Sequence, residues 1–69
     1  MRVLIYGTED CPFTRAARDD YGRRGFSVDY HDVAIDPQAL AAMLALSGGE
    51  RAVPVILEGR TIKVGFGGS

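Results

Sequence analysis

The chain has 69 residues, enough for one domain with a small hydrophobic core. Eight basic and nine acidic residues nearly balance, to a net charge of −1, and no Lys/Arg block favours a nucleic acid or an anionic membrane. No apolar run reaches the ~20 residues of a membrane span or the length of a secretory signal. The single cysteine forbids an internal disulfide and suits a reducing compartment. We therefore expect one cytoplasmic, monomeric domain over residues 1–69, without nucleic-acid or membrane partners.

The first half of the chain alternates strand and helix patterns. Residues 2–6 predict a central strand, because branched apolar residues follow one another without a break. Pro12 suits the first turn of a helix, where a missing N–H is no loss, so Cys11 is predicted to be the N-cap. The apolar stripe of this helix is expected at Phe13, Ala16, Ala17 and Tyr21. Residues 27–33 alternate apolar and polar side chains, which indicates a second strand at a sheet edge.

The second half predicts one more helix and a hairpin. Asp36-Pro37 is typical of a helix start, and the glycines after Ser47 end that helix. Residues 53–57 and 61–64 predict two strands joined by a tight turn. The order β-α-β-α-β-β indicates a mixed four-stranded sheet with helices packed on it, the first two strands being parallel.

Two short motifs stand where these elements meet. Cys11-Pro12-Phe13-Thr14 begins the first helix, and Val53-Pro54 begins the third strand. Together with the glycine-rich end of the chain, they resemble the glutaredoxins, which are small thioredoxin-fold thiol–disulfide oxidoreductases. The chain is also similar to compact NrdH-type redoxins and to small relatives in which selenocysteine replaces the attacking cysteine. The resemblance covers nearly the whole chain and implies a thioredoxin fold (class α/β) without the family's final helix.

The resemblance also implies a role for each matching residue. Cys11 would be the nucleophile, with Thr14 in its motif and Pro54 as the cis-proline facing it. The backbone of Val53 would pair with glutathione or with a peptide. The remaining substrate or glutathione contacts would come from Pro12, Phe13, Gly67 and Gly68. The residue chemistry of Arg51 leaves two readings open, a bidentate carboxylate contact and a solvated loop charge.

The position of Cys11 at the start of a helix favours a reactive thiol. The thiolate is the nucleophile, and an ordinary cysteine has a pKa of about 8.5. The groups expected to stabilise the thiolate are the N–H groups near Phe13 and Thr14, the Thr14 hydroxyl and the charge of Arg15. Glu9 and Asp10 act in the opposite sense, by a small amount if they are solvated. We therefore expect a lowered pKa for Cys11.

Thr14 stands where a second cysteine would allow internal resolution of a mixed disulfide. Its presence predicts a monothiol cycle that is resolved by an external thiol, with glutathione as co-substrate. Two departures from the family bear on glutathione: Thr8 replaces a frequent lysine, and no acidic residue follows the glycines. Disulfide-containing proteins are the other expected partners. No metal site is expected, since His31 is the only histidine and has no ligand partners nearby in the sequence.

Two other functions remain open at this point. The first is an iron–sulfur carrier, in which two monomers bridge a cluster through Cys11 and glutathione. Pro12 weighs against it, because the cluster-binding monothiol glutaredoxins typically carry glycine there. The second is a redox-sensing adaptor, in which oxidation of Cys11 controls a partner protein.

Overall fold

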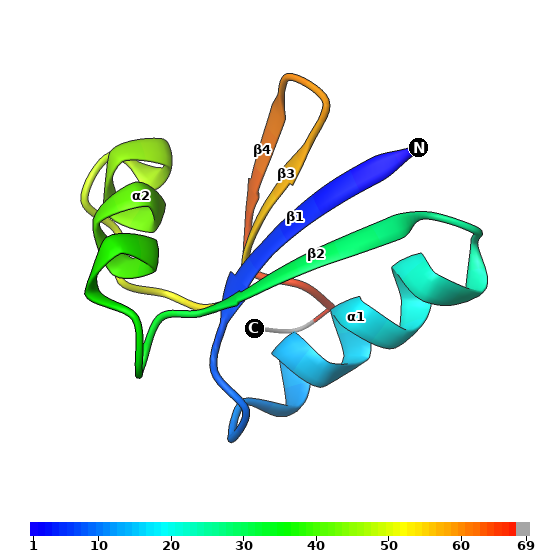
Figure 1. The fold of residues 1–69 in the computed structure, drawn as a ribbon, viewed down its shortest axis with the longest axis horizontal. Helices are drawn as coiled ribbons and strands as arrows, with labels where there is room; N and C mark the ends of the chain where they lie inside the picture. Colours follow the sequence, from blue (N-terminus) through cyan, green and yellow to red (C-terminus); the bar gives the residue numbers. More distant parts are fainter. Residues whose placement is uncertain (68–69) are drawn as a thin grey trace.

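A computed structural model describes residues 1–67 of the chain, so the predicted role of Gly68 lies outside the described residues. The observed order matches the expected one, with two helices interspersed among four strands (Figure 1). The elements are β1 (Arg2–Gly7), α1 (Pro12–Arg23), β2 (Ser27–Asp32), α2 (Pro37–Ser47), β3 (Val55–Glu58) and β4 (Thr61–Val64). This is the predicted thioredoxin-type arrangement.

The four strands form one mixed sheet in the order β2-β1-β3-β4. β1 is central and pairs in parallel with β2, with Ile5 opposite Tyr30. It pairs antiparallel with β3, and β3 pairs antiparallel with β4 through the terminal hairpin. β2 therefore lies at the edge of the sheet, as its alternating pattern predicts, and the end of β1 lies between β2 and β3.

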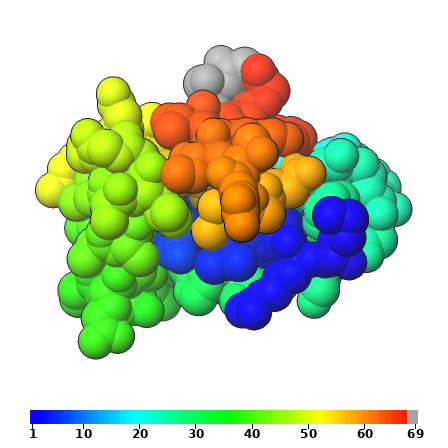
Figure 2. Space-filling view, turned by 90° about the horizontal axis from the view of Figure 1, so that it is seen from above, coloured from blue at the N-terminus to red at the C-terminus, as the bar shows by residue number. Residues whose placement is uncertain are grey.

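The two helices cover opposite faces of the sheet, so the core has two parts. One part joins α1 to the face of β1 that carries Val3 and Ile5. The other joins α2 to the opposite face, where Tyr6 of β1 and Val55 of β3 meet Met43. Figure 2 shows the β3–β4 hairpin, in orange, between α2 in green and α1 in cyan. The unbroken apolar run of β1 is explained by cover on both faces.

Both helices begin where the sequence predicts, and each has proline in its first turn. Cys11 is the N-cap of α1, in an extended conformation. Asp36 is the N-cap of α2, and its side chain accepts a hydrogen bond from the Gln38 N–H. Gly48, with φ of 70°, ends α2 in the left-handed conformation that glycine adopts readily.

Three local predictions are wrong. The buried stripe of α1 consists of Thr14, Ala17 and Tyr21, whereas Phe13 and Ala16 are exposed. In the first turn of α1 it is Thr14 that faces Gly7 of β1, so Phe13, one residue earlier, points away from the sheet. The third strand begins at Val55 rather than residue 53, and β1 includes Gly7, one residue beyond the predicted end of the first strand. Within residues 1–67, no helix has the length and apolar character needed to cross a membrane.

Candidate active site around Cys11

Cys11 lies at the junction of β1 and α1, opposite the segment that leads into β3. Its Sγ lies 3.9 Å from the carbonyl oxygen of Val53, a long contact for a thiol donor. The Val53–Pro54 peptide bond is cis, as the resemblance implies, and Pro54 is buried. The structure thus brings together the two motifs, which are more than forty residues apart in the sequence.

The segment after β4 forms a third wall of the site. The Gly65 N–H donates a 2.7 Å hydrogen bond to the carbonyl oxygen of Pro54, which ties this segment to the second motif. Phe66 packs against the core beside α1. A Cβ on Gly67 would lie 3.9 Å from Cδ1 of Phe13, so Gly67 is a neighbour of the first motif. Phe13, which is 37% exposed, is available to a substrate at this place.

The environment of Cys11 favours the thiolate. Burial raises the pKa of the thiol. The hydroxyl and N–H of Thr14, the N–H of Phe13 and the charge of Arg15 favour the thiolate and lower the pKa by more, although Sγ accepts no cap hydrogen bond from the helix in the structure. The net result is a pKa for Cys11 below its ordinary value, in the direction that the sequence predicts. A lowered pKa increases the fraction of the nucleophilic form at neutral pH.

Thr14 is fully buried beneath the first turn of α1. Its Oγ1 has no hydrogen-bond partner among the described oxygen and nitrogen atoms. The hydroxyl contributes instead to the lowered pKa of Cys11, as a hydrogen-bond donor to the sulfur in the thiolate form. A buried hydroxyl without another partner is costly, and interaction with the thiolate offsets that cost.

Gly7, at the end of β1, allows Thr14 to occupy this position. A Cβ at residue 7 would lie 2.5 Å from Cγ2 of Thr14, closer than nonbonded atoms approach. Its φ is not positive, so glycine is required here by space and not by backbone conformation. The predicted strand ends at residue 6, before Gly7, and no sequence signal shows that Gly7 contacts Thr14.

Glu9, which precedes Cys11 by two residues, is less opposed to the thiolate than its sequence position suggests. The carboxylate of Glu9 forms a 3.0 Å ion pair with Arg18. Its carbonyl oxygen accepts a 3.0 Å hydrogen bond from Arg15. These contacts hold both guanidinium groups along one side of α1.

The remaining predicted residues have simpler surroundings. Arg51 is exposed in the loop before Val53, and no polar partner is found for its side chain within residues 1–67. His31 stacks on Tyr6, with 5.0 Å between ring centroids, and pairs with Asp29 at 3.3 Å. The described part of the chain contains no group of three or more His, Cys, Asp or Glu residues suited to a metal ion.

A protein-family model matches residues 3–62 and is described as glutaredoxin. The chain belongs to the glutaredoxin family. The match includes both Cys11-Pro12-Phe13-Thr14 and Val53-Pro54, the motifs that the fold brings face to face. The protein is therefore a thiol–disulfide redox protein of this family. A search of curated proteins found no significant match.

Solved structures support the same fold. NrdH-redoxin from Escherichia coli, described as glutaredoxin-like with a thioredoxin-like activity profile, is 33% identical over 97% of this chain and 86% of that one, with a TM-score of 0.82. A glutaredoxin from Brucella melitensis is 28% identical over 94% and 70% of the two chains, with a TM-score of 0.70. A glutaredoxin from Archaeoglobus fulgidus is 21% identical over 94% and 75%, with a TM-score of 0.78, and shows the fold alone.

Proposed function

We propose that this protein is a cytoplasmic, monomeric oxidoreductase that reduces mixed disulfides by a monothiol mechanism, with glutathione as co-substrate. One observation carries the proposal: the position three residues after Cys11 holds the buried Thr14, and the chain has no other cysteine. The hydroxyl can stabilise the Cys11 thiolate, but it cannot attack a disulfide to release a bound substrate.

The cycle has two exchange steps. The Cys11 thiolate attacks the glutathione sulfur of a substrate mixed disulfide, a new S–S bond forms, and the substrate sulfur leaves as a thiolate that takes a proton from water. A second glutathione, as the thiolate, then attacks the glutathione sulfur bound to Cys11. Glutathione disulfide is released and the Cys11 thiolate is regenerated. The net reaction consumes one mixed disulfide and one glutathione thiol.

The groups around Cys11 support this chemistry. The lowered pKa of Cys11 makes it both an available nucleophile and a good leaving group in the second step. Val53, beside the sulfur, presents its backbone to an incoming chain, and the exposed Phe13 offers apolar contact. Arg51 supplies a free guanidinium for a glutathione carboxylate. Gly67 leaves room beside Phe13 for the ligand.

A second candidate concerns the electron donor. The Escherichia coli relative is described as having a thioredoxin-like activity profile, and it is 33% identical to this chain. That likeness favours protein disulfides as substrates and a thioredoxin-reductase-type enzyme as donor. Glutathione would then be replaced by a protein thiol in the resolving step, while the role of Cys11 would not change.

The experiment that tests the proposal is reduction of a small glutathione mixed disulfide, coupled to glutathione reductase. We expect turnover that depends on glutathione and is lost in Cys11→Ser. Thr14→Cys adds an internal thiol, so it should gain reduction of protein disulfides. Turnover supported by thioredoxin reductase and not by glutathione would move the assignment to the second candidate, and turnover with neither would refute the proposal. Visible absorbance of the purified protein would indicate an iron–sulfur cluster instead.

An amide-shift titration with glutathione tests the site independently of turnover. We expect shifts at residues 11–14, 53–54 and 65–67, the segments that surround the sulfur. Shifts elsewhere, or none, would contradict the proposed glutathione site.

A further inference from the structure

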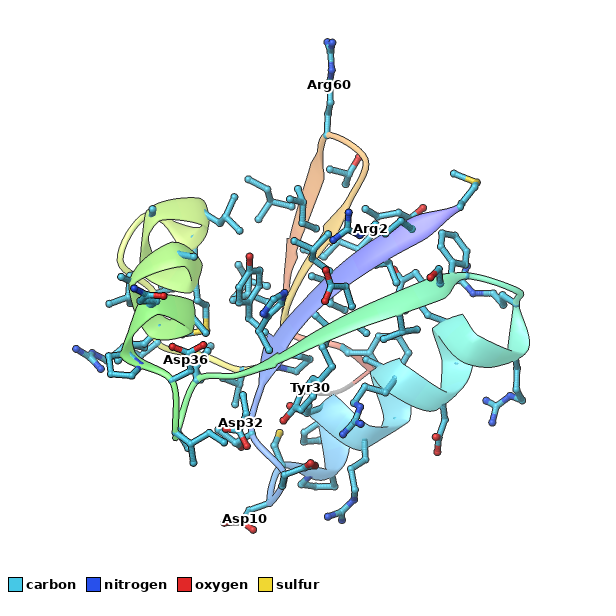
Figure 3. The ribbon with its side chains drawn as sticks, in the orientation of Figure 1. Arg2, Asp10, Tyr30, Asp32, Asp36 and Arg60 are labelled. Atoms are coloured by element: carbon cyan, nitrogen blue, oxygen red, sulfur yellow. The ribbon has the colours of Figure 1, made fainter. Side chains whose placement is uncertain are left out.

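A groove lies between α1 and the edge strand β2. It is lined by Arg15, Arg18 and Asp19 of α1 and by Val28 and Tyr30 of β2. Figure 3 shows Tyr30 extending from β2 towards the first half of α1. The guanidinium of Arg18 lies 3.9 Å from the centre of the Tyr30 ring. The groove therefore begins within two turns of the reactive thiol.

The outer edge of β2 offers backbone groups beside this groove. The N–H of Ser27 bonds to the Met1 carbonyl, and the N–H of Val33 bonds to the Gly7 carbonyl, so odd-numbered residues face β1. Because parallel strands alternate in this respect, the N–H and C=O groups of Val28 and Tyr30 face outward. No strand covers this edge within the described residues. The two residues of β2 that line the groove thus also carry the free backbone groups.

The charge in the groove favours a negative ligand. Arg15 donates to the backbone carbonyl of Glu9 and has no carboxylate partner among residues 1–67. Arg18 pairs with the carboxylate of Glu9, which is 61% exposed and can be replaced by a ligand carboxylate. Asp19 is the one acidic residue in the lining, and Glu9 adds a second carboxylate beside Arg18, so Arg15 is the guanidinium left to attract a ligand. A strand added to β2 would place every second side chain on this face.

We propose that the β2 edge and the α1–β2 groove bind an extended segment of a protein partner whose alternate side chains are acidic. The backbone of the segment pairs with Val28 and Tyr30, while its carboxylates meet Arg15 and Arg18. This mode is strand addition to a free sheet edge, with the groove supplying specificity. The identification of the partner as a protein disulfide substrate rests on the proposed function. The binding site itself rests on the geometry of the groove.

The test is an amide-shift titration of the Cys11→Ser protein, which separates binding from redox turnover. The probe is acetyl-Val-Glu-Val-Glu-Val-Glu-Val-amide, and the control peptides replace Glu with Lys or carry N-methyl groups on the valines. We expect the Glu peptide to shift residues 15–19 and 27–32 and to bind about tenfold more tightly than either control. The Lys peptide loses the charge pairs, and the N-methylated peptide loses the strand hydrogen bonds.

Matched variants locate the charge effect. Arg18→Gln should weaken binding of the Glu peptide by about two- to fivefold, and Asp19→Asn should strengthen it by a similar factor. Arg60→Gln removes the same charge at the tip of the hairpin, far from the groove, and should leave binding unchanged (Figure 3). Equal affinity for the Glu and Lys peptides, shifts confined to residues 61–64, concentration-dependent shifts without peptide, or no binding would each overturn the inference.

Discussion

Thr14 shows how one side chain can affect reactivity without contributing to stability. Its buried hydroxyl has no oxygen or nitrogen partner, yet it lowers the pKa of Cys11. In the thiol form of the protein the hydroxyl is a buried polar group without compensation, which costs free energy. In the thiolate form it donates to a charge. The cost of the buried hydroxyl to stability and its effect on the Cys11 thiolate can therefore be measured separately, at pH values where Cys11 is a thiol or a thiolate.

Replacing Thr14 by valine, which has the same shape, should slow the reaction of Cys11 and spare the fold. Loss of the hydroxyl raises the pKa of Cys11, and we expect alkylation at pH 7 to slow roughly fivefold, as for ~1 kcal/mol of hydrogen bonding. The free energy of unfolding at pH 5, where Cys11 is a thiol, should stay the same or rise. Iodoacetamide kinetics against pH and urea denaturation measure both, with Thr61→Val as control. An unchanged pH profile would contradict the assigned role.

Gly7 affects the site through the space that it leaves for Thr14. Gly7→Ala should displace Thr14, lower the free energy of unfolding by about 1–3 kcal/mol and raise the pKa of Cys11. Adding Thr14→Ala removes the clashing atoms and should restore much of the stability. Gly22→Ala on α1 meets nothing within 4 Å and should instead stabilise by about 0.5–1 kcal/mol. Urea denaturation of wild type, Gly7→Ala, Thr14→Ala and the double variant tests the contact between the two residues. Additive losses of unfolding free energy in the double variant would disprove that contact.

At the scale of elements, a polar cluster joins α1 to the β3–β4 hairpin. The hydroxyl of Tyr21, on α1, donates a 2.8 Å hydrogen bond to Glu58 of β3. Lys63 of β4 lies 3.2 Å from both the Tyr21 oxygen and the Glu58 carboxylate. The hydrogen bond from Tyr21, followed by the one from Lys63, lowers the pKa of Glu58. The cluster thus positions the hairpin relative to α1. The last residue of β4, Val64, is followed directly by the Gly65–Gly67 segment of the site.

The lowered pKa of Glu58 predicts a pH dependence of stability. A carboxyl whose pKa is lower in the folded state stabilises above its unfolded pKa, about 4.3, and loses this contribution as pH falls through the folded value. Wild type should therefore be more stable than Glu58→Gln at pH 7, and the difference should vanish well below pH 4. Urea denaturation across this range measures it. Glu50→Gln, in an exposed loop, should show no such difference, and a constant gap for Glu58→Gln would contradict the prediction.

At the scale of the whole molecule, the two-part core leaves little reserve of stability. A chain of this length is expected to have roughly 3–10 kcal/mol of unfolding free energy. Met43 is fully buried and is central to the part of the core beneath α2. The other part, beneath α1, supports the start of the helix that carries Cys11.

Met43→Ala should lower the free energy of unfolding by about 2–5 kcal/mol, which is a large share of the total, and the variant should be partly unfolded at 37 °C. Ile35→Ala, at a position 80% exposed, should change it by less than about 0.5 kcal/mol. Thermal and urea unfolding followed by circular dichroism measure both. A small effect of Met43→Ala would mean that the sheet and α1 fold without the α2 side.

The sequence by itself determined the element order, the helix starts at Pro12 and Pro37, the edge position of β2 and the position of Cys11 at the start of a helix. These follow from local physical chemistry: proline and a capping residue limit where a helix begins, and apolar spacing shows which faces are covered. The pairing of Cys11 with Val53-Pro54 came from a family resemblance rather than from local rules. The direction of the Cys11 pKa shift was also predictable, because helix N–H groups act on their own N-cap.

Only the tertiary structure decided which side chains meet across elements. Thr14 is buried and Phe13 exposed because the first turn of α1 directs Thr14 at Gly7 of β1, an orientation of the helix that apolar spacing does not specify. The need for Gly7 depends on β1 passing under the first turn of α1. The groove beside β2 exists because Arg15 and Arg18 lie next to Val28 and Tyr30, and the outward backbone groups follow from strand register. Such contacts depend on packing between distant segments, so no single stretch of sequence specifies them.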